Sequence, residues 1–198
     1  MTRLFLASGS PRRAELLTQV GVPHTVLRAP DIDETALPGE TPEVYASRLA
    51  DAKARAGQRR HQPPGAVLGA DTVVALNGEL LGKPRDDDHA LVMLRALGGR
   101  EHRVISAVCL CLGEQCRVAL SVTRVRFRTL DEAGLRAYVA TGEGRDKAGG
   151  YGIQGQGAAL VASLAGSYSG VVGLPLERTL PLLEWAGVPY WQSAGIKD

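Results

Sequence analysis

The chain has 198 residues, 44% of them hydrophobic, and a formal net charge of +2 at pH 7. This near-neutral balance argues against broad binding to nucleic acid or to a membrane surface, and no stretch approaches the roughly 18–20 apolar residues of a membrane span. The opening residues hold too short an apolar run for a signal peptide. We therefore expect a cytoplasmic protein with a single domain over residues 1–198.

Residues 4–21 predict a short strand followed by a helix, with Ser10 as N-cap and Pro11 at the first helical position. Arg12 and Arg13 then fall in the first helical turn, where each positive charge opposes the helix dipole at a cost of about 0.3–1 kcal/mol. An anion would relieve this, because helix N-termini and guanidinium groups bind phosphate. We predict an anion site here; two solvated arginines are the alternative.

Beyond this helix, hydrophobic periodicity and turn residues predict the remaining elements. They are a strand leading into an acidic loop (22–34), a helix (41–57), a hairpin (63–84), a helix (86–99), two antiparallel strands (102–130), a helix (131–144), two strands (158–166 and 167–176) and a final helix (175–189). Because strand and helix signals alternate early and strands cluster later, the pattern predicts a mixed α/β fold.

The hairpin places three polar side chains near one another. Its Asn-Gly turn at 77–78 is a strong hairpin signal. Counting outward from the turn pairs Thr72 with Lys83 and puts Asp71 beside them, in an otherwise apolar run. Strict alternation would put Lys83 on the face opposite to Asp71, so we expect a bulge or a strand end near Gly82. An aspartate that caps the hairpin edge is the alternative.

The glycine-rich segment 146–157 contains a GxGxxG pattern. A dinucleotide-binding fingerprint needs a strand before this pattern and a helix after it, whereas a charged loop precedes it here and a strand-like run follows. We therefore interpret the segment as an active-site loop with Lys147 and Gln154 as its functional side chains; a structural turn is the alternative.

An acidic cluster and one lysine add further candidates. Asp31, Asp33 and Glu34 lie in one loop, where they form either a solvated surface or ligands for a divalent metal. Lys53 borders the apolar stripe predicted for the helix 41–57, and is either a snorkelling lysine or a phosphate contact. These cations and carboxylates, without a nucleophile–histidine pair, suit hydrolysis of a phosphoanhydride by metal-assisted water.

The three cysteines, Cys109, Cys111 and Cys116, lack metal-ligand spacing. Cys109 and Cys111 alternate on a predicted strand, so we interpret the cysteines as small core residues in a reducing compartment. The four histidines are scattered and form no HxH or HxxxH pair, so the sequence argues against a zinc site.

Five motifs carry a family resemblance, in order over most of the chain: LASGSPRRAELL, DIDE, GADTVVALNGELLGKP, DKAGGYGIQG and GSYSGVVGLPL. Together they resemble the Maf family of nucleoside triphosphate pyrophosphatases. The resemblance implies a mixed α/β (α+β) fold related to inosine triphosphate pyrophosphatases, with a long mixed sheet, flanking helices and a cleft between two lobes. It also implies hydrolysis of a nucleoside triphosphate to the monophosphate and pyrophosphate with a divalent metal, Mg²⁺ or Mn²⁺.

The resemblance assigns roles to individual residues. It implies that Asp71 accepts the proton of the attacking water. It implies that the phosphate-binding turn consists of Ser8, Arg12 and Arg13. It implies further metal or phosphate contacts at Glu34, Lys53 and Lys83, with Glu34 and Asp71 as the metal ligands.

Three positions, Arg12, Thr72 and Gln154, resemble the branch that acts on dTTP and UTP. The sister branch, which acts on 7-methyl-GTP, carries Trp, Gln and Glu there. We expect pyrimidine triphosphates, and modified pyrimidine nucleotides besides, as substrates in nucleotide-pool housecleaning; a homodimer is left open. A 7-methyl-GTP pyrophosphatase and a non-enzymatic nucleotide-binding regulator of septum formation are the alternatives. Gly170 departs from the asparagine of many family members, which puts a side-chain contact there in doubt.

Overall fold

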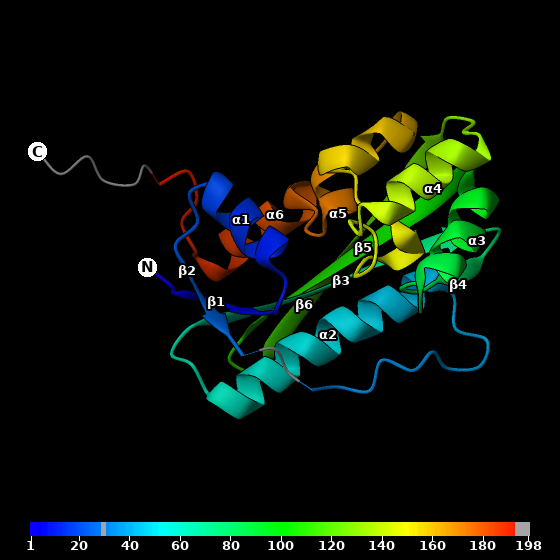
Figure 1. Cartoon of the computed structure of the whole chain (residues 1–198). Helices are drawn as coiled ribbons and strands as arrows, with labels where there is room; N and C mark the ends of the chain where they lie inside the picture. Colours follow the sequence, from blue (N-terminus) through cyan, green and yellow to red (C-terminus); the bar gives the residue numbers. More distant parts are fainter. Residues whose placement is uncertain (29–30, 193–198) are drawn as a thin grey trace, which may run out of the picture.

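The computed structural model describes residues 1–28 and 31–192. Within these residues a seven-stranded sheet has the order β2-β1-β3-β5-β6-β7, and β4 pairs with β3 (Figure 1). The strands are β1 (Leu4–Ala7), β2 (His24–Leu27), β3 (Ala66–Leu76), β4 (Glu79–Leu81), β5 (Glu101–Leu112), β6 (Gln115–Phe127) and β7 (Val161–Ala165). The first three strands pair in parallel and the rest in antiparallel fashion. The predicted mixed α/β fold with a long mixed sheet is confirmed.

Helices flank this sheet on both faces. They are α1 (Pro11–Gln19), α2 (Pro42–His61), α3 (Asp87–Leu97), α4 (Glu132–Ala140), α5 (Tyr168–Val172) and α6 (Leu176–Ala186), with two 3₁₀ segments, η1 (Ala148–Gly150) and η2 (Gly155–Leu160). Among the described residues, no helix combines the length and the apolar character needed to cross a bilayer.

Helix α2 lies against one face of the sheet (Figure 1). Its alanines Ala46, Ala50 and Ala54 pack with residues of β3 and β5 in one apolar cluster. The helix approaches β3 closely at Gly69, where a Cβ atom would lie 2.4 Å from the backbone oxygen of Ala50 and the backbone nitrogen of Ala54. Any larger side chain at Gly69 would push α2 away from the strand.

The opposite face of the sheet carries two separate apolar clusters. One joins α1 and α6 to β1 and the first half of β3, and its largest buried members include Leu4, Leu6, Leu17, Leu68 and Leu183. The other joins α3 and α4 to the far ends of β3, β5 and β6, with Leu94, Leu97, Val104, Phe127 and Leu135 among its members. The two clusters form two lobes over one continuous sheet, in agreement with the predicted cleft between lobes.

The edge of β3 is open in the middle. Strand β1 pairs with β3 over residues 66–68 and β4 pairs with it over residues 74–76, so among the described residues no strand pairs with this edge of β3 at 69–73. Asp71 and Thr72 therefore point to opposite faces of β3 and still reach the same space beside its open edge.

Two predictions along the chain are wrong, and the predicted strand 158–166 is wrong in part, because its first three residues belong to the 3₁₀ segment η2 and β7 begins at Val161. The predicted strand 167–176 contains helix α5, because the Ser167 side chain accepts a hydrogen bond from the backbone N–H of Gly170 at 3.0 Å and caps a helical turn. The predicted pairing of Thr72 with Lys83 does not form, because β4 ends at Leu81. The strand end expected near residue 82 and the Asn-Gly turn of the hairpin are confirmed.

The cysteines depart from the prediction of reduced core residues, because Cys111 and Cys116 form a disulfide. The two residues face each other across the hairpin of β5 and β6, with a Cα–Cα distance of 4.1 Å. Their spacing of five residues is short enough for the tight turn between the strands to bring them together. Cys109 is a buried free thiol, as a core residue should be.

Candidate active site

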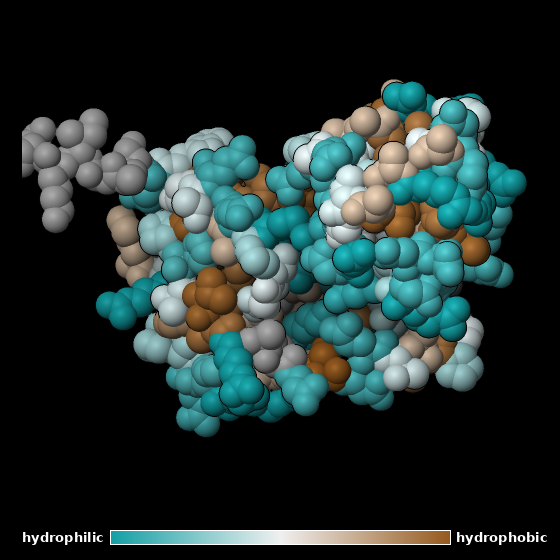
Figure 2. Space-filling model, in the orientation of Figure 1, coloured by the Kyte–Doolittle hydropathy of each residue, from teal (hydrophilic) through white to brown (hydrophobic). Residues whose placement is uncertain are grey.

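A cavity of about 610 Å³ lies beside the open edge of β3, between the two lobes. Figure 2 shows a hollow at the middle of the molecule, in the orientation of Figure 1, with hydrophilic residues around it. Among the described residues, the side chains that line the cavity and carry a charge at neutral pH are five cations and three carboxylates: Arg12, Arg13, Lys53, Lys83, Lys147, Glu34, Asp71 and Asp146. The excess of cations suits a polyanionic ligand such as a triphosphate.

Asp71 is the buried carboxylate of this cavity, with 6% of the residue exposed. Its Oδ1 accepts a hydrogen bond from Lys53 Nζ at 2.7 Å, and the same ammonium lies 2.8 Å from Glu34 Oε1. The close packing of α2 on β3 at Gly69 brings Lys53 to Asp71. A buried carboxylate needs such a partner, because burying an unpaired charge is costly.

Arg13 is held by two hydrogen bonds at the start of α1. Its Nε donates to the Gly173 carbonyl at 2.8 Å and its Nη1 donates to Ser8 Oγ at 3.1 Å. Burial lowers the pKa of the Arg13 guanidinium, and Asp71 acts in the opposite direction. Ser8 is itself buried and lies behind Arg13, so the structure places it where it can orient this guanidinium.

Thr72 is tied to the strand and loop beside it. Its Oγ1 lies 2.9 Å from Ser106 Oγ and donates to the Gly173 carbonyl at 3.3 Å. Ser106 in turn donates to the carbonyl of Gly170 at 2.6 Å. The backbone of residues 170–173 thus supplies the acceptors at this wall of the cavity, and Gly170 takes part without a side chain.

The glycine-rich segment folds around Glu143. The Glu143 carboxylate accepts hydrogen bonds from the backbone N–H groups of Gln156 and Gly157, both at 2.8 Å. A Cβ atom at Gly157 would lie 1.9 Å from the Gly152 carbonyl oxygen, so this close approach requires glycine. No long helix follows the GxGxxG pattern, only the 3₁₀ segment η2, which agrees with the interpretation against a dinucleotide fingerprint.

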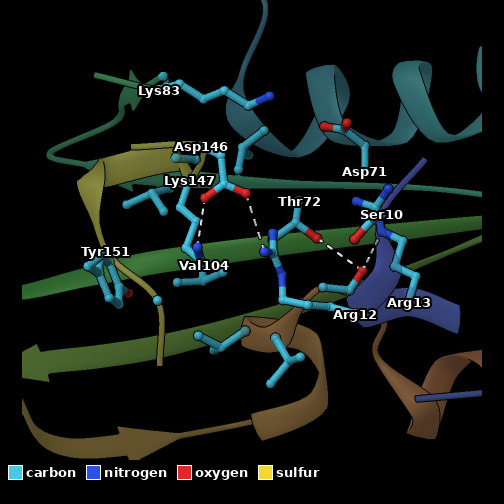
Figure 3. A pocket seen from close by; sticks show the side chains of 18 of the residues that line it. Ser10, Arg12, Arg13, Asp71, Thr72, Lys83, Val104, Asp146, Lys147 and Tyr151 are labelled. Atoms are coloured by element: carbon cyan, nitrogen blue, oxygen red, sulfur yellow. Dashed lines mark hydrogen bonds and ion pairs between the residues drawn. The ribbon is translucent and has the colours of Figure 1, made fainter. Parts of the chain in front are cut away.

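Asp146 joins this segment to helix α1. It pairs with Lys147 at 2.7 Å and with Arg12 at 3.5 Å, and the dashed lines in Figure 3 mark these contacts. Gln154 is exposed and lines the same cavity. Lys147 and Gln154 thus both line the cavity, and the functional role of their side chains stays a prediction.

Tyr151 lines the cavity and is supported from behind by His102, which the sequence analysis did not single out. His102 Nε2 lies 2.7 Å from the Tyr151 hydroxyl, and both rings pack edge-on against Phe127. Burial lowers the pKa of His102 to about 4 and raises the pKa of Tyr151. The sequence signal for Tyr151 as a cavity residue is its position between two glycines of the predicted active-site loop.

The structure brings most of the predicted site residues together. The following line one cavity: Arg12, Arg13, Glu34, Lys53, Asp71, Thr72, Lys83 and Gln154. Lys83 is exposed at the end of the hairpin, and Ser8 lies behind the cavity wall. Besides His102, the residues missed from sequence are Asp146, Ser106 and the backbone carbonyl of Gly173, which position the predicted ones.

Comparisons with known proteins agree on one family. Residues 3–186 match the family described as Maf-like protein. A protein of Alcanivorax borkumensis named dTTP/UTP pyrophosphatase is 62% identical over 189 residues, which cover 96% of this chain and 98% of that protein. A protein of the same name from Aromatoleum aromaticum is 50% identical over 199 residues, which cover 94% of this chain and 97% of that protein.

Several solved structures are also similar to this chain. The chain is similar to the nucleoside-triphosphatase / dITP/XTP pyrophosphatase from Mycobacterium abscessus, with a TM-score of 0.46 and 17% sequence identity. The similarity covers 93% of this chain and 95% of that chain.

Proposed function

The chain belongs to the Maf-like protein family, and on that premise we propose that it hydrolyses dTTP and UTP to the nucleoside monophosphate and pyrophosphate. The observation that carries the proposal is the buried Asp71 carboxylate, held by Lys53 in a cavity that is lined mainly by cations. A triphosphate supplies the negative charge that this cavity matches, and water supplies the nucleophile.

Asp71 is the proton acceptor in this proposal. A water oxygen attacks a phosphorus atom of the triphosphate, the P–O bond to the pyrophosphate leaving group breaks, and a proton of the water passes to the Asp71 carboxylate. General-base catalysis of this kind contributes about 10²–10⁴-fold. Lys53 holds the Asp71 carboxylate in place through its 2.7 Å hydrogen bond.

The remaining cations bind the phosphates. Arg12 and Arg13 stand at the N-terminus of α1, and Lys83 and Lys147 stand across the cavity from them. Charge neutralisation and positioning supply most of the catalysis in phosphoryl transfer. Ser8 takes part through Arg13, because its hydroxyl accepts from that guanidinium.

The carboxylates fit a divalent metal. Glu34 and Asp71 already share one cation, the Lys53 ammonium, at 2.8 and 2.7 Å. Oxygen ligands of this kind suit Mg²⁺ or Mn²⁺. We infer that Glu34 and Asp71 hold the metal when the nucleotide is bound, and that the metal neutralises phosphate charge.

Gln154 reads the base in this proposal. Its amide has N–H donors and a carbonyl acceptor, which can pair with the O4 acceptor and the N3–H donor of thymine or uracil. Arg12 and Thr72 complete the set of positions that resembles the dTTP and UTP branch. Thr72 contributes indirectly in this proposal. Its hydroxyl is hydrogen-bonded to Ser106 and to the Gly173 carbonyl, and it thereby positions this wall of the cavity.

Partners and location follow from the substrate. We infer a cytoplasmic enzyme that acts on free nucleotides, standard or modified, and that neither nucleic acid nor membrane is its partner. A homodimer is compatible with this activity, and sedimentation of the purified protein would measure it.

The decisive experiment is a panel assay of purified protein with Mg²⁺, scored by pyrophosphate release. We expect dTTP and UTP to be hydrolysed well above 7-methyl-GTP. Preference for 7-methyl-GTP would support the sister activity instead. Binding of dTTP without turnover would support the nucleotide-binding regulator, because sensing needs the cavity but not Asp71.

A further inference from the structure

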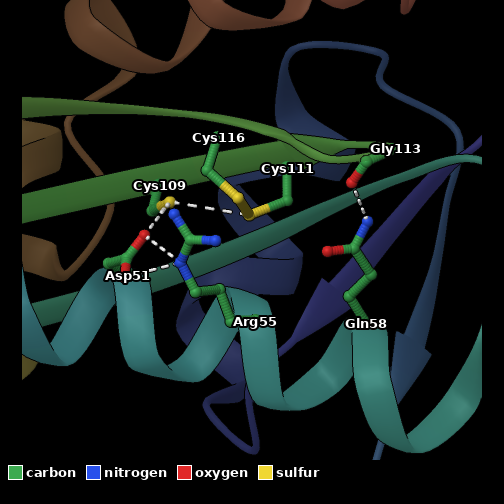
Figure 4. The surroundings of a disulfide bond; sticks show 7 residues. All are labelled: Asp51, Arg55, Gln58, Cys109, Cys111, Gly113 and Cys116. Atoms are coloured by element: carbon green, nitrogen blue, oxygen red, sulfur yellow. Dashed lines mark hydrogen bonds and ion pairs between the residues drawn. A yellow bond between two sulfur atoms is a disulfide. The ribbon is translucent and has the colours of Figure 1, made fainter.

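A cluster of side chains of the kinds that bind metals lies between α2 and the hairpin of β5 and β6, and none of them lines the cavity (Figure 4). The sulfur atoms of Cys109, Cys111 and Cys116 all lie within 4.8 Å of one another. Asp51 of α2 points at the same group, with its Oδ1 3.5 Å from Cys109 Sγ. Three sulfurs from β5 and β6 thus form one cluster, and the Asp51 carboxylate of α2 contacts it at Cys109.

Two of the distances between these atoms match those of a tetrahedral ion. With Zn–S of about 2.3 Å and Zn–O of about 2.0 Å, a tetrahedral zinc separates two sulfur ligands by about 3.8 Å and a sulfur and an oxygen ligand by about 3.5 Å. The Cys109–Cys111 sulfur distance is 3.9 Å and the distance from Cys109 Sγ to Asp51 Oδ1 is 3.5 Å. These two edges of the tetrahedron already exist in the disulfide form.

The surroundings suit a bound cation. Arg55 donates to both oxygens of Asp51, at 2.9 and 2.8 Å, and hydrogen bonds of this kind orient a metal-binding carboxylate. Cys109 and Cys111 are fully buried, whereas Cys116 and Asp51 are partly exposed and give an ion access from solvent. The ligands converge only because the hairpin folds and α2 packs on it, so their spacing in the sequence does not indicate a metal site.

We propose that the reduced protein binds one thiophilic divalent cation, Zn²⁺, through Cys109, Cys111, Cys116 and Asp51. A dithiol donates two electrons and two protons to the Cys111–Cys116 disulfide and becomes a disulfide itself. Zn²⁺ then replaces the protons of the three thiols, which pass to water, and forms three Zn–S bonds and one Zn–O bond. In the reverse direction a disulfide takes two electrons from the Cys111 and Cys116 thiolates and two protons from water and becomes a dithiol, the Cys111–Cys116 disulfide forms again, and the ion is released as Cys109 regains its proton.

The site fastens α2 to the sheet. Asp51 stands two residues from Lys53 on that helix, so the metal would fix the helix that positions the lysine of the cavity.

Cobalt substitution tests the proposal, because Co²⁺ bound to thiolates gives a charge-transfer absorption that Co²⁺ bound to the cavity carboxylates does not give. The full chain is reduced with a dithiol, freed of metal and titrated with Co²⁺ and then with Zn²⁺. We expect one Co²⁺ per chain with thiolate and tetrahedral bands, displacement by Zn²⁺, and a higher melting temperature with Zn²⁺. The oxidised protein should lack the bands.

Two cysteine variants and a carboxylate pair locate the site. Cys109→Ser keeps Cys111 and Cys116 and should lose the bands. If circular dichroism shows that this variant does not fold, Cys116→Ser takes its place and should lose the bands too. Asp51→Asn should weaken Co²⁺ binding tenfold or more, while the exposed Asp88→Asn should bind as the parent protein does. Absence of thiolate bands in the reduced protein, or equal bands in Cys109→Ser, would overturn the proposal.

Discussion

The Lys53 ammonium donates to Asp71 Oδ1 over 2.7 Å, although the two residues stand on a helix and a strand that are far apart in sequence. Both side chains are largely buried, with 14% and 9% of their side-chain surface exposed. Both members of this pair line the cavity, and they can be tested separately for chemistry and for stability.

Asp71→Asn should leave the fold intact and lower kcat for dTTP by about 100-fold or more, because the amide cannot accept the proton of water. The melting curve and pyrophosphate release report the two effects. Asp88→Asn, at an exposed carboxylate of α3, is the matched control and should keep full activity. Parent-like turnover in folded Asp71→Asn would remove this residue from the chemistry.

Lys53→Met should lower the free energy of unfolding at pH 7 by about 2–5 kcal/mol, because it leaves the Asp71 carboxylate buried without its partner. The double variant Lys53→Met, Asp71→Asn should recover a large part of that loss, since no buried charge is left over. Urea unfolding of the four proteins of this cycle measures the coupling. Additive losses would mean that the pair is not energetically linked.

Arg13→Ala should weaken dTTP binding and also destabilise the nucleotide-free protein, by about 1–3 kcal/mol. The sequence alone suggests the opposite sign for stability, because a cation opposes the dipole of α1. The hydrogen bonds of Arg13 to Gly173 and Ser8 outweigh that effect. Arg12→Ala is the comparison: its partner Asp146 is exposed, so its loss should cost at most about 1 kcal/mol. Melting curves with and without dTTP measure both.

Gln154→Glu should lower the ratio of kcat/KM for dTTP over 7-methyl-GTP by about tenfold or more. The carboxylate loses the amide donor for O4 and places a negative charge against that carbonyl. Because this proposal assigns Gln154 to the base and neither to the phosphates nor to the attacking water, general hydrolysis should change less than the ratio. An unchanged ratio would mean that the base is read by other side chains.

Stability should fall as the pH drops from 6.5 toward 4, because the pKa of His102 is lowered from 6.5 to about 4 by burial. In that window the unfolded chain binds a proton that the folded chain does not, which amounts to about 3 kcal/mol when complete. Urea unfolding at pH 7 and pH 5 measures it. His102→Phe should flatten the dependence, whereas the exposed His61→Gln should not.

Local signals predicted much of the fold. The Asn-Gly turn gave the β3–β4 hairpin, and Thr41, whose Oγ1 accepts from the backbone N–H of Val44 at 3.3 Å, marked the start of α2. The segment 167–176 failed because its valines have high strand propensity, while the Ser167 cap that makes it helical is a weaker signal.

The candidate site was predicted as a set of residues but not as an arrangement. Lys53 and Asp71 meet only because α2 packs onto Gly69, a tertiary contact that no local pattern encodes. The Cys111–Cys116 disulfide likewise follows from strand register, which the alternation of β5 and β6 left undefined. His102 was missed because a lone histidine in a strand carries no signal for the tyrosine that it supports.

The long strands β3, β5 and β6 run beneath both lobes and carry members of both apolar clusters on one face. One continuous hydrogen-bonded sheet, rather than a flexible linker, thus connects the two lobes. To bring the two lobes closer together, the sheet would have to twist more, and the strain would be shared by many of its hydrogen bonds. The width of the cleft is therefore set in advance by the elasticity of the sheet, and adjustment to a ligand is left to side chains and to the glycine-rich loop.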